Sequence, residues 1–147
     1  MNEFLTLFTR ASKLLREAAD EGMSRHGVRV GQNIILEALW QEDGLTPGEV
    51  ARRLHLSTPT VVNAATRMED AGLITRKRDS ADARLVRLCL TRRARSVQTA
   101  IERERSALEQ RATSNLNDQE RRHLHSALAK ITETLSADHR AHSSRAE

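Results

Sequence analysis

Large apolar residues recur every three or four positions near the start of the chain, which predicts a long amphipathic helix from Asn2 to about Met23. Its apolar stripe consists of Phe4, Leu7, Phe8, Ala11, Leu14, Leu15 and Ala18. At 1.5 Å per residue this helix is roughly 30 Å long. A second stripe predicts a helix from Val30 to Gln41, and we expect its Trp40, the only tryptophan, in the core.

The pattern between residues 46 and 73 predicts two short helices joined by a tight turn. Thr46 and Glu49 have the spacing of a capping box, in which each residue satisfies a free backbone N–H of the other. Ser57 is the expected cap of the second helix, and Gly72 suits a left-handed helix end. The residues expected to face inward are Val50, Ala51, Leu54, Val61, Ala64, Ala65 and Met68. This arrangement is a helix-turn-helix, whose second helix enters a DNA major groove.

The outward face of that second helix consists mainly of short side chains: Thr58, Pro59, Val62, Asn63, Thr66 and Arg67. Small residues let a helix approach base edges, an Asn can pair with adenine, and a Val methyl group can pack on a thymine methyl group. Arg67 and the free N–H groups near Ser57 could bind phosphates. Taken alone, this face fits an ordinary amphipathic helix in a helical domain equally well.

The segment after this helix predicts a basic β-hairpin. Residues 73–77 and 85–91 read as strands, and a polar loop separates them. Between Arg67 and Arg95 there are nine Lys and Arg residues against four acids, a balance of +5, whereas the whole chain has +4. The positive charge is therefore concentrated where a winged helix would contact DNA. Leu45, just before the capping box, is a candidate for a single-residue strand.

Composition narrows the class of protein. Only 2% of residues are aromatic, which disfavours base stacking of the kind that single-strand binders use. The net charge of +4 and the pI near 10.2 suit an acidic partner. One cysteine excludes an intramolecular disulfide, and no apolar run approaches the length of about 18 residues that a membrane span needs. The N-terminus does not read as a signal peptide, so we expect a cytoplasmic protein.

The order of these elements, ending in the sequence RDSADARLVRLCLT at residues 78–91, resembles the MarR (multiple antibiotic resistance regulator) family of winged-helix transcription factors. The resemblance covers roughly residues 4–135. It implies that Arg84 lies at the tip of the wing and enters the minor groove, while Asp82 holds its side chain. A narrow minor groove concentrates negative potential, which suits an inserted Arg. The alternative is a surface ion pair in a turn, which contributes little.

These arguments give one candidate set of DNA-contacting residues: Ser57, Thr58, Pro59, Thr60, Val62, Asn63, Thr66, Arg67, Arg76, Arg78, Asp82 and Arg84. Two positions depart from the family pattern. Where the family usually has Gly in the helix-turn-helix turn, this chain has His55, so either His55 adopts a positive φ or the turn has a different shape. Ala94 also replaces a usual Gly, which favours a helix that starts at Thr91 without a kink.

Two further helices are predicted in the C-terminal part. Thr91 caps the first, which runs to about Thr113, and Asn117 with Glu120 forms a capping box for the second. We expect the chain to fray beyond Ala137. The residues expected inward are Val97, Ile101, Ala107, Leu108, Ala112, Leu124, Leu128, Ile131 and Leu135. These stripes and that of the first helix exceed what a small winged helix could cover.

The resemblance implies that the first helix and the last two intertwine with a second subunit. A two-fold dimer places two recognition helices about 34–36 Å apart, so the operator should be a near-palindrome. The expected fold is mainly α with a small β-hairpin wing, a winged helix-turn-helix flanked by dimerisation helices. We expect a single domain over 1–147. Its parts would be a DNA-binding lobe (30–91), a helical dimerisation lobe (1–25 and 92–137) and a polar tail (138–147).

Signs of catalysis are lacking in the sequence. The six histidines do not form a metal-ligand set with the lone cysteine, and neither a phosphate loop nor a nucleophile elbow is found. We therefore expect no enzyme, no catalytic residue, no metal and no cofactor. Cys89 is interpreted as a small strand residue. The alternative is an oxidant-sensing thiol whose pKa Arg84 and Arg87 would lower.

The sequence thus predicts a homodimeric, sequence-specific regulator of transcription that binds double-stranded DNA, and a repressor rather than an activator. The resemblance further implies release by a small-molecule effector, often aromatic or phenolic. It would bind between the dimerisation helices and the winged helix, where Arg16, His26 and Trp40 are expected. Two alternatives stay open, namely a dimeric helical module that binds protein and an architectural protein that binds DNA without regard to sequence.

Overall fold

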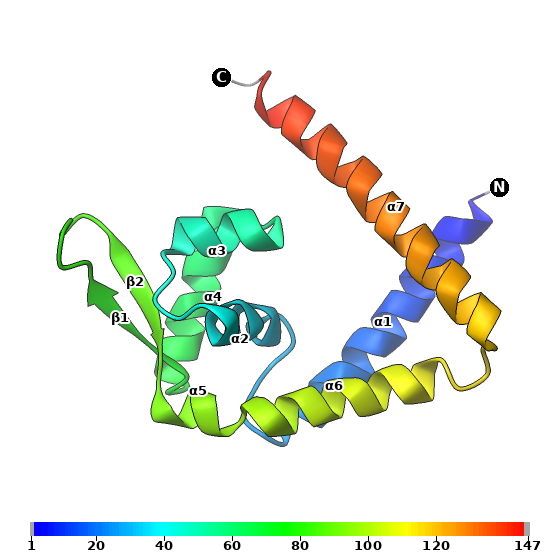
Figure 1. Ribbon diagram of the computed structural model, residues 1–147, viewed down its shortest axis with the longest axis horizontal. Helices are drawn as coiled ribbons and strands as arrows, with labels where there is room; N and C mark the ends of the chain where they lie inside the picture. Colours follow the sequence, from blue (N-terminus) through cyan, green and yellow to red (C-terminus); the bar gives the residue numbers. More distant parts are fainter. Residues whose placement is uncertain (1, 146–147) are drawn as a thin grey trace. The chain divides into compact units, whose positions relative to one another are not determined.

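The computed structural model describes residues 2–145, which form helices and one two-stranded antiparallel hairpin (Figure 1). In chain order the elements are α1 (Glu3–Ser24), α2 (Gln32–Gln41), α3 (Pro47–Leu54), α4 (Thr58–Asp70), β1 (Ile74–Arg78), β2 (Val86–Leu90), α5 (Arg92–Ser96), α6 (Gln98–Ala112) and α7 (Asp118–Ser143). The predicted fold, mainly α with a hairpin wing, is confirmed. The chain divides into two compact units, one through Leu108 and one from Glu109. The predicted lobes stay a prediction.

Helix α3 begins and ends as its sequence predicts. The Glu49 N–H donates to Thr46 Oγ1 at 3.2 Å, and the Thr46 N–H donates to Glu49 Oε2 at 2.8 Å, which completes the capping box. These bonds, with that of the Thr46 backbone N–H foremost, hold the pKa of Glu49 below its usual value. His55 ends the helix at φ 54° and ψ 41°. It therefore adopts the positive φ that was one of the two expectations for the turn.

Helix α4 is capped at both ends by local chemistry. The Ser57 side chain accepts a hydrogen bond from the Thr60 N–H at its start. At its end, Gly72 has φ 75°, its N–H donates to Glu69 O, and the Leu73 N–H donates to Met68 O. This pair of bonds is a Schellman motif, which a Gly at that position favours. The expected left-handed end is confirmed.

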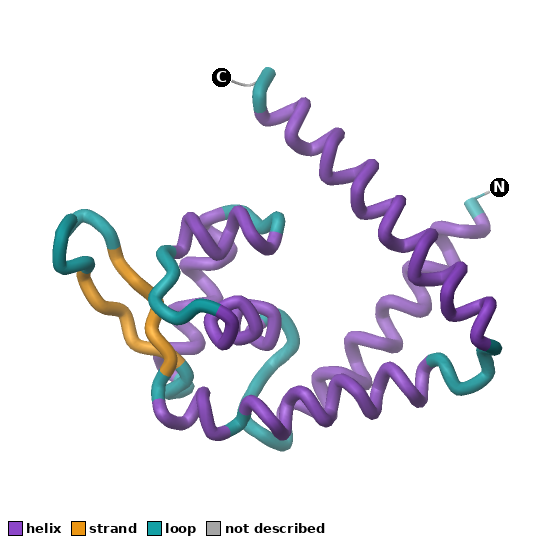
Figure 2. Tube along the Cα trace, viewed as in Figure 1, coloured by secondary structure: helices purple, strands orange, loops and turns teal. Residues whose placement is uncertain are grey.

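Strands β1 and β2 pair from Ile74 with Leu90 to Arg78 with Val86, and each strand end lies one residue from its predicted position. Leu45 adds a single bridge beside Leu88, because the Leu88 N–H donates to Leu45 O at 2.8 Å. The tube in Figure 2 shows the two strands joined by one loop at the end away from the helices. That loop is the tip of the wing.

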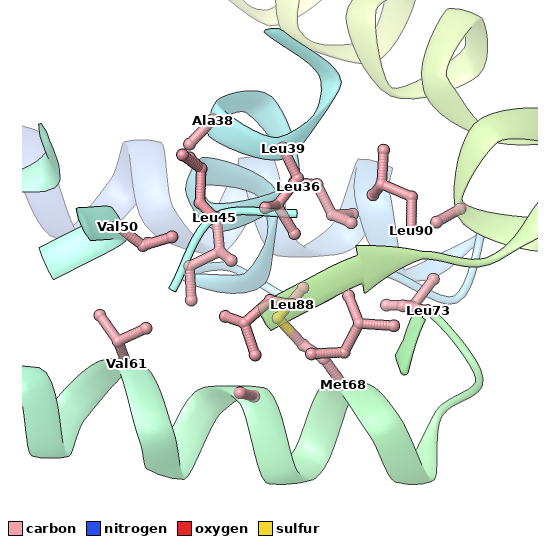
Figure 3. Close-up of a cluster of buried hydrophobic side chains, with 14 of the residues drawn as sticks. Leu36, Ala38, Leu39, Leu45, Val50, Val61, Met68, Leu73, Leu88 and Leu90 are labelled. Atoms are coloured by element: carbon pink, nitrogen blue, oxygen red, sulfur yellow. The ribbon is translucent and has the colours of Figure 1, made fainter. Parts of the chain in front are cut away.

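The core of the winged helix gathers side chains from every one of its elements. Leu36 and Leu39 of α2, Val61 of α4 and Leu88 of β2 are fully buried, and Figure 3 shows them pointing toward one another. Ile101 of α6 is also fully buried, as predicted. Trp40 is only half-buried, and its indole N–H donates to Ala94 O at 3.1 Å. It therefore lies at the edge of the core and not inside it.

The helix predicted from Thr91 to Thr113 is not continuous. It starts as expected, since Thr91 Oγ1 accepts from the Ala94 N–H at 3.2 Å, but it divides into α5 and α6 at Val97. The Ser96 hydroxyl donates to Arg93 O at 2.8 Å, and such a local bond competes with the helical ladder and bends it. Ala107 and Ala112 are exposed in this chain, so their expected inward position is wrong here.

Helix α1 ends with a buried Met23, but most of its apolar stripe is uncovered. Six large side chains are between 44% and 60% exposed, namely Phe4, Leu5, Leu7, Phe8, Leu14 and Leu15. The rings of Phe4 and Phe8 lie 5.8 Å apart on this face. The predicted stripe is present, and within the chain it lacks a cover over most of its length.

Helix α7 has the predicted capping box. The Glu120 N–H donates to Asn117 Oδ1 at 2.8 Å, and the Asn117 N–H donates to Glu120 Oε2 at 2.9 Å. The helix runs through Ser143, so it continues past Ala137, where the sequence analysis expected the chain to fray. Residues 146–147 of the predicted tail lie outside the described residues. Of the inward positions expected in α7, Ile131 is half-buried, whereas Leu124, Leu128 and Leu135 are exposed within this chain. Within residues 2–145, every helix is too short or too polar to span a lipid bilayer.

Candidate nucleic-acid interface

The predicted recognition face lies on the exposed side of α4. Val61, Ala65 and Met68 are fully buried on its inner side. The predicted DNA-contacting residues of this helix and its cap are all exposed: Ser57, Thr58, Pro59, Thr60, Val62, Asn63, Thr66 and Arg67. The helix therefore presents short side chains with a single cation, a surface that can approach a groove of DNA closely.

The start of α4 combines a side-chain cap with one free backbone donor. Ser57 Oγ accepts from the Thr60 N–H at 3.2 Å and lies 2.7 Å from Thr60 Oγ1. Thr60 is thereby held by the cap. Pro59 has no N–H and the Val61 N–H donates to Ser57 O, so the Thr58 N–H is the remaining donor of the first turn. This donor and the positive end of the helix dipole attract anions, which suits a phosphate.

At the wing tip, the Arg84 side chain is hydrogen-bonded to the Asp82 carboxylate. Arg84 Nε donates to Asp82 Oδ1 at 3.0 Å, and Nη2 donates to Oδ2 at 3.1 Å. This bidentate pair holds the pKa of Asp82 below and that of Arg84 above its usual value. The Arg84 side chain is nevertheless 90% exposed. The predicted contact is present, and its role in the minor groove stays a prediction.

Asp79 organises the wing loop, which the sequence analysis did not foresee. Its Oδ2 accepts from the N–H groups of Ala81 and Asp82, and its Oδ1 accepts from Arg87 Nε at 2.5 Å. The hydrogen bond from Arg87, followed by those of the loop backbone, holds the pKa of Asp79 below its usual value. An Asp that begins a polar turn is a local signal for such bonds. Its pairing with Arg87 across the hairpin has no local signal.

The loop between α2 and α3 also forms hydrogen bonds with β2. Arg87 Nη1 donates to Gly44 O at 2.9 Å, and the Leu90 N–H donates to Asp43 Oδ1 at 2.8 Å. Arg95 pairs with the other carboxylate oxygen of Asp43 at 2.7 Å. These contacts add to the Leu45 bridge in attaching the wing to the body, and Asp43 is a second residue that sequence reasoning missed.

Arg76 reaches from β1 back to α4. Its Nη2 donates to Thr66 Oγ1 at 2.7 Å and to Val62 O at 3.1 Å, and its backbone N–H donates to Glu69 Oε2 at 3.2 Å. The other candidate DNA-contacting cation of β1, Arg78, is exposed at the end of the strand. Arg76 is instead engaged with the recognition helix.

Across residues 2–145, no cluster of three or more His, Cys, Asp or Glu side chains is placed to bind a metal ion. Cys89 is half-buried in β2. Its interpretation as a small strand residue stays a prediction.

The sequence model of the MarR family matches residues 31–86, from the start of α2 to the first residue of β2. Residues 31–86 are a MarR-family domain. All twelve residues of the candidate set, from Ser57 to Arg84, lie within this MarR-family domain. The family resemblance inferred from the motif at residues 78–91 is confirmed.

Two curated relatives match part of the chain. One is the HTH-type transcriptional regulator TtmR of Methylorubrum extorquens, 33% identical over 75 residues, which cover 51% of this chain and 38% of TtmR. The other is the organic hydroperoxide resistance transcriptional regulator of Bacillus subtilis, 30% identical over 90 residues, which cover 61% of each protein. The matched segments thus span less than two thirds of both relatives.

The fold extends beyond the MarR-family domain. The structure of the Staphylococcus aureus MepR–DNA complex superposes with a TM-score of 0.81 at 27% identity, over 89% of this chain and 97% of MepR. The match therefore includes helices on both sides of residues 31–86. It agrees with the winged helix-turn-helix described above.

Proposed function

We propose that this protein is a homodimeric, sequence-specific transcription regulator that binds double-stranded DNA. The observation that carries the proposal is the exposed recognition face of α4 beside a basic wing that bears an exposed Arg84, both within the MarR-family domain. Two relatives are named transcriptional regulators, and the MepR structure is a complex with DNA. Members of this family regulate transcription and are not enzymes.

The geometry supports separate roles for the candidate residues. Thr58, Pro59, Val62 and Asn63 would meet base edges in the major groove, where small side chains and an amide can read sequence. Ser57 and Arg67 would bind phosphates at the two ends of the helix, and such contacts position the protein. The remaining members of the set, Thr60, Thr66, Arg76, Arg78 and Asp82, would hold or flank these contacts, and Arg84 would enter the minor groove.

The uncovered apolar stripe of α1 supports the dimer. Contiguous apolar patches are small on most monomeric proteins, and larger ones mark interfaces. Exposed Leu124, Leu128 and Leu135 of α7 form another such row. A two-fold dimer would present two copies of α4, so that each half of a near-palindromic operator meets one of them.

Selection of bound duplexes from a random pool, near physiological salt, tests the proposal as a whole. We expect enrichment of one inverted repeat whose half-sites lie about one helical turn apart. Recovery of DNA without a common motif would favour an architectural protein that binds mainly through phosphates. Recovery of no DNA would favour the module that binds protein.

Replacement of Arg84 by Ala tests the wing. We expect affinity for the selected duplex to fall by at least several-fold while the dimer stays folded, because the exposed cation at the wing tip is lost. Arg103→Ala, which removes the same charge from the exposed face of α6, is the matched control and should bind like the parent protein. An Arg84→Ala variant with the parent affinity would contradict the wing assignment.

Replacement of Asn63 by Ala tests base readout. We expect the preferred half-site to change, because an amide that pairs with a base is lost while phosphate contacts remain. The measurement is a second selection with the variant. An equal loss of affinity on every sequence would argue against a contact between Asn63 and a base.

Repression relieved by an effector is the finer part of the proposal, and the family resemblance supports it. In a reporter assay, the protein should lower transcription from a promoter that carries the selected operator. A panel of aromatic and phenolic compounds should contain members that release the purified protein from that operator. Activation of the reporter, or binding unaffected by every compound, would contradict this part alone.

A further inference from the structure

The side chain of Arg76 is the only cation of the candidate set that the structure ties to the recognition helix itself, within residues 2–145. It crosses from β1 to α4, where Nη2 donates to Thr66 Oγ1 at 2.7 Å and to Val62 O at 3.1 Å. Its own backbone N–H is held by Glu69, one turn further along the same helix. Arg76 therefore contacts α4 over two successive turns.

These bonds also fix Thr66. The Thr66 hydroxyl donates to Val62 O at 3.1 Å while it accepts from Arg76, so its one proton is committed and one lone pair is occupied. The rotation of this side chain is thereby restricted, and its methyl group is the part left without a polar partner. Thr66 lies one turn from Val62, next to Asn63, on the exposed face.

Arg67 and Arg78 offer a contrast on the neighbouring surface. Over residues 2–145, neither side chain makes a hydrogen bond or an ion pair, so either can turn toward a phosphate without losing a partner. Arg76 would have to release Thr66 and Val62 to present Nη2 to DNA. Its geometry is that of a brace between wing and helix.

We propose that Arg76 is a positioning residue for sequence readout, which fixes the Val62–Thr66 turn of α4 against the wing and does not serve mainly as a phosphate anchor. The inference rests on the proposed function, because it concerns how the same surface recognises DNA. By this arrangement, the spacing between the recognition face and Arg84 is set by bonds inside the protein. Removal of Arg76 should therefore change which sequences are preferred.

Salt dependence separates the two roles. A residue that neutralises a phosphate contributes about 0.9 to the slope of log K against log salt concentration, and its loss weakens all sequences alike. Binding of Arg76→Ala and of the matched Arg67→Ala should be measured on the selected duplex and its single-base variants at several salt concentrations. We expect Arg67→Ala to lower the slope by about 1 per contacted phosphate and to keep the order of preference.

For Arg76→Ala we expect the same salt-dependence slope as for the parent protein. We expect the relative affinities for the single-base variants of the duplex to change several-fold. Thr66→Val keeps the charge of Arg76 and the branched shape of residue 66 but removes the acceptor. It should shift the preference in the same way, and the double variant should differ little from either single variant. A melting curve for each variant shows that it is folded.

A lowered slope with an unchanged order of preference for Arg76→Ala would overturn the inference, as would a Thr66→Val variant with the parent preference. The proposed function fails separately, if the parent protein itself selects no motif. If the parent protein selects an inverted repeat but Arg76→Ala lowers the salt slope and keeps the order of preference, the positioning role of Arg76 is rejected. The proposed function as a DNA-binding regulator then still stands.

Discussion

The core of the winged helix and the first helix have similar apolar patterns in the sequence but opposite surroundings in the structure. Leu36, Leu39 and Leu88 of the winged helix are fully buried. On α1, Leu7 is 60% and Leu14 is 59% exposed. Periodicity therefore identifies the apolar face of an element, but it does not identify what covers that face.

Because of this difference, the winged-helix core and α1 should contribute to different properties of the protein. A close-packed core stabilises the fold of one chain, since each buried aliphatic side chain contributes about 1.5–3 kcal/mol by leaving water. An equally apolar face without a cover contributes nothing of this kind until a partner arrives. Substitutions in the two regions should accordingly affect different quantities, namely association for α1 and unfolding for the core.

The largest effect is expected from Leu7→Glu on α1. If the stripe is a two-fold interface, the change acts twice and should weaken the dimer by about 3–6 kcal/mol, since two buried Leu side chains are lost. Sedimentation equilibrium over a range of concentrations measures the association. Thr9→Glu adds the same charge on the opposite side of the helix and should leave association unchanged. If both variants associate with the same affinity, the apolar stripe of α1 is not the dimer interface.

The next effect is expected from Leu88→Ala in β2. Leu88 is fully buried, so its truncation should lower the free energy of unfolding by about 2–5 kcal/mol, through lost burial and a cavity. Leu85→Ala, next to the same strand but 42% exposed, is the control and should change it by less than about 1 kcal/mol. Chemical denaturation at fixed protein concentration compares them. Similar losses for both would mean that the core is not packed as described.

The sequence predicted the parts of this fold whose causes are local. The capping box of Thr46 and Glu49 lies within one turn, and the left-handed end at Gly72 follows from one residue. The contact of Asp82 with Arg84 spans two residues and was also expected. Short spacing leaves few alternative partners, which is why such features can be predicted.

The contacts that the sequence did not predict join distant residues. Asp43 accepts from the Leu90 N–H, 47 positions away, and the Arg87 guanidinium reaches Gly44 O, 43 positions away. Arg76 meets Val62 only because β1 folds back along α4. The sequence around a charged residue such as Arg76 does not indicate which distant residue it will contact. The contacts that hold the wing against α4 can therefore be identified only from the folded structure.

A smaller effect is expected at His55, the residue where a local rule is broken inside the better packed region. Its φ of 54° is unusual for a side chain with a Cβ, and a β-branched residue fits it least. His55→Val should lower the free energy of unfolding by about 1–3 kcal/mol. His55→Gly should keep it or raise it by up to about 1 kcal/mol, because the strain is relieved. Thermal and chemical denaturation measure both.

A His55→Val variant as stable as the parent would show that the turn relaxes to another shape. The same pair of variants also separates stability from recognition, since the turn connects α3 to α4. His55→Gly should bind the selected duplex as the parent protein does, because neither its backbone nor the exposed face of α4 is changed.

The smallest effect is expected in the pH dependence of the wing. The pKa of Asp79 is lowered in the folded protein by Arg87 and by backbone N–H groups, so the carboxylate is favoured by folding. Its stabilising contribution is therefore present above the unfolded pKa of about 3.9 and is lost as the pH falls through the lower folded value. Asp79→Asn should be less stable than the parent protein at pH 7, and the difference should shrink below pH 4.

Glu17→Gln on α1 sharpens this contrast. Glu17 pairs with Lys13 at 3.8 Å, but the two side chains are 61% and 76% exposed, so water screens the pair and little stability depends on it. Denaturation of the three proteins between pH 3 and pH 7 should give a curve for Glu17→Gln that parallels the parent, while the curve for Asp79→Asn converges on it in acid. Parallel curves for both variants would mean that the carboxylate of Asp79 does not hold the wing loop, and that the loop is ordered by its backbone alone.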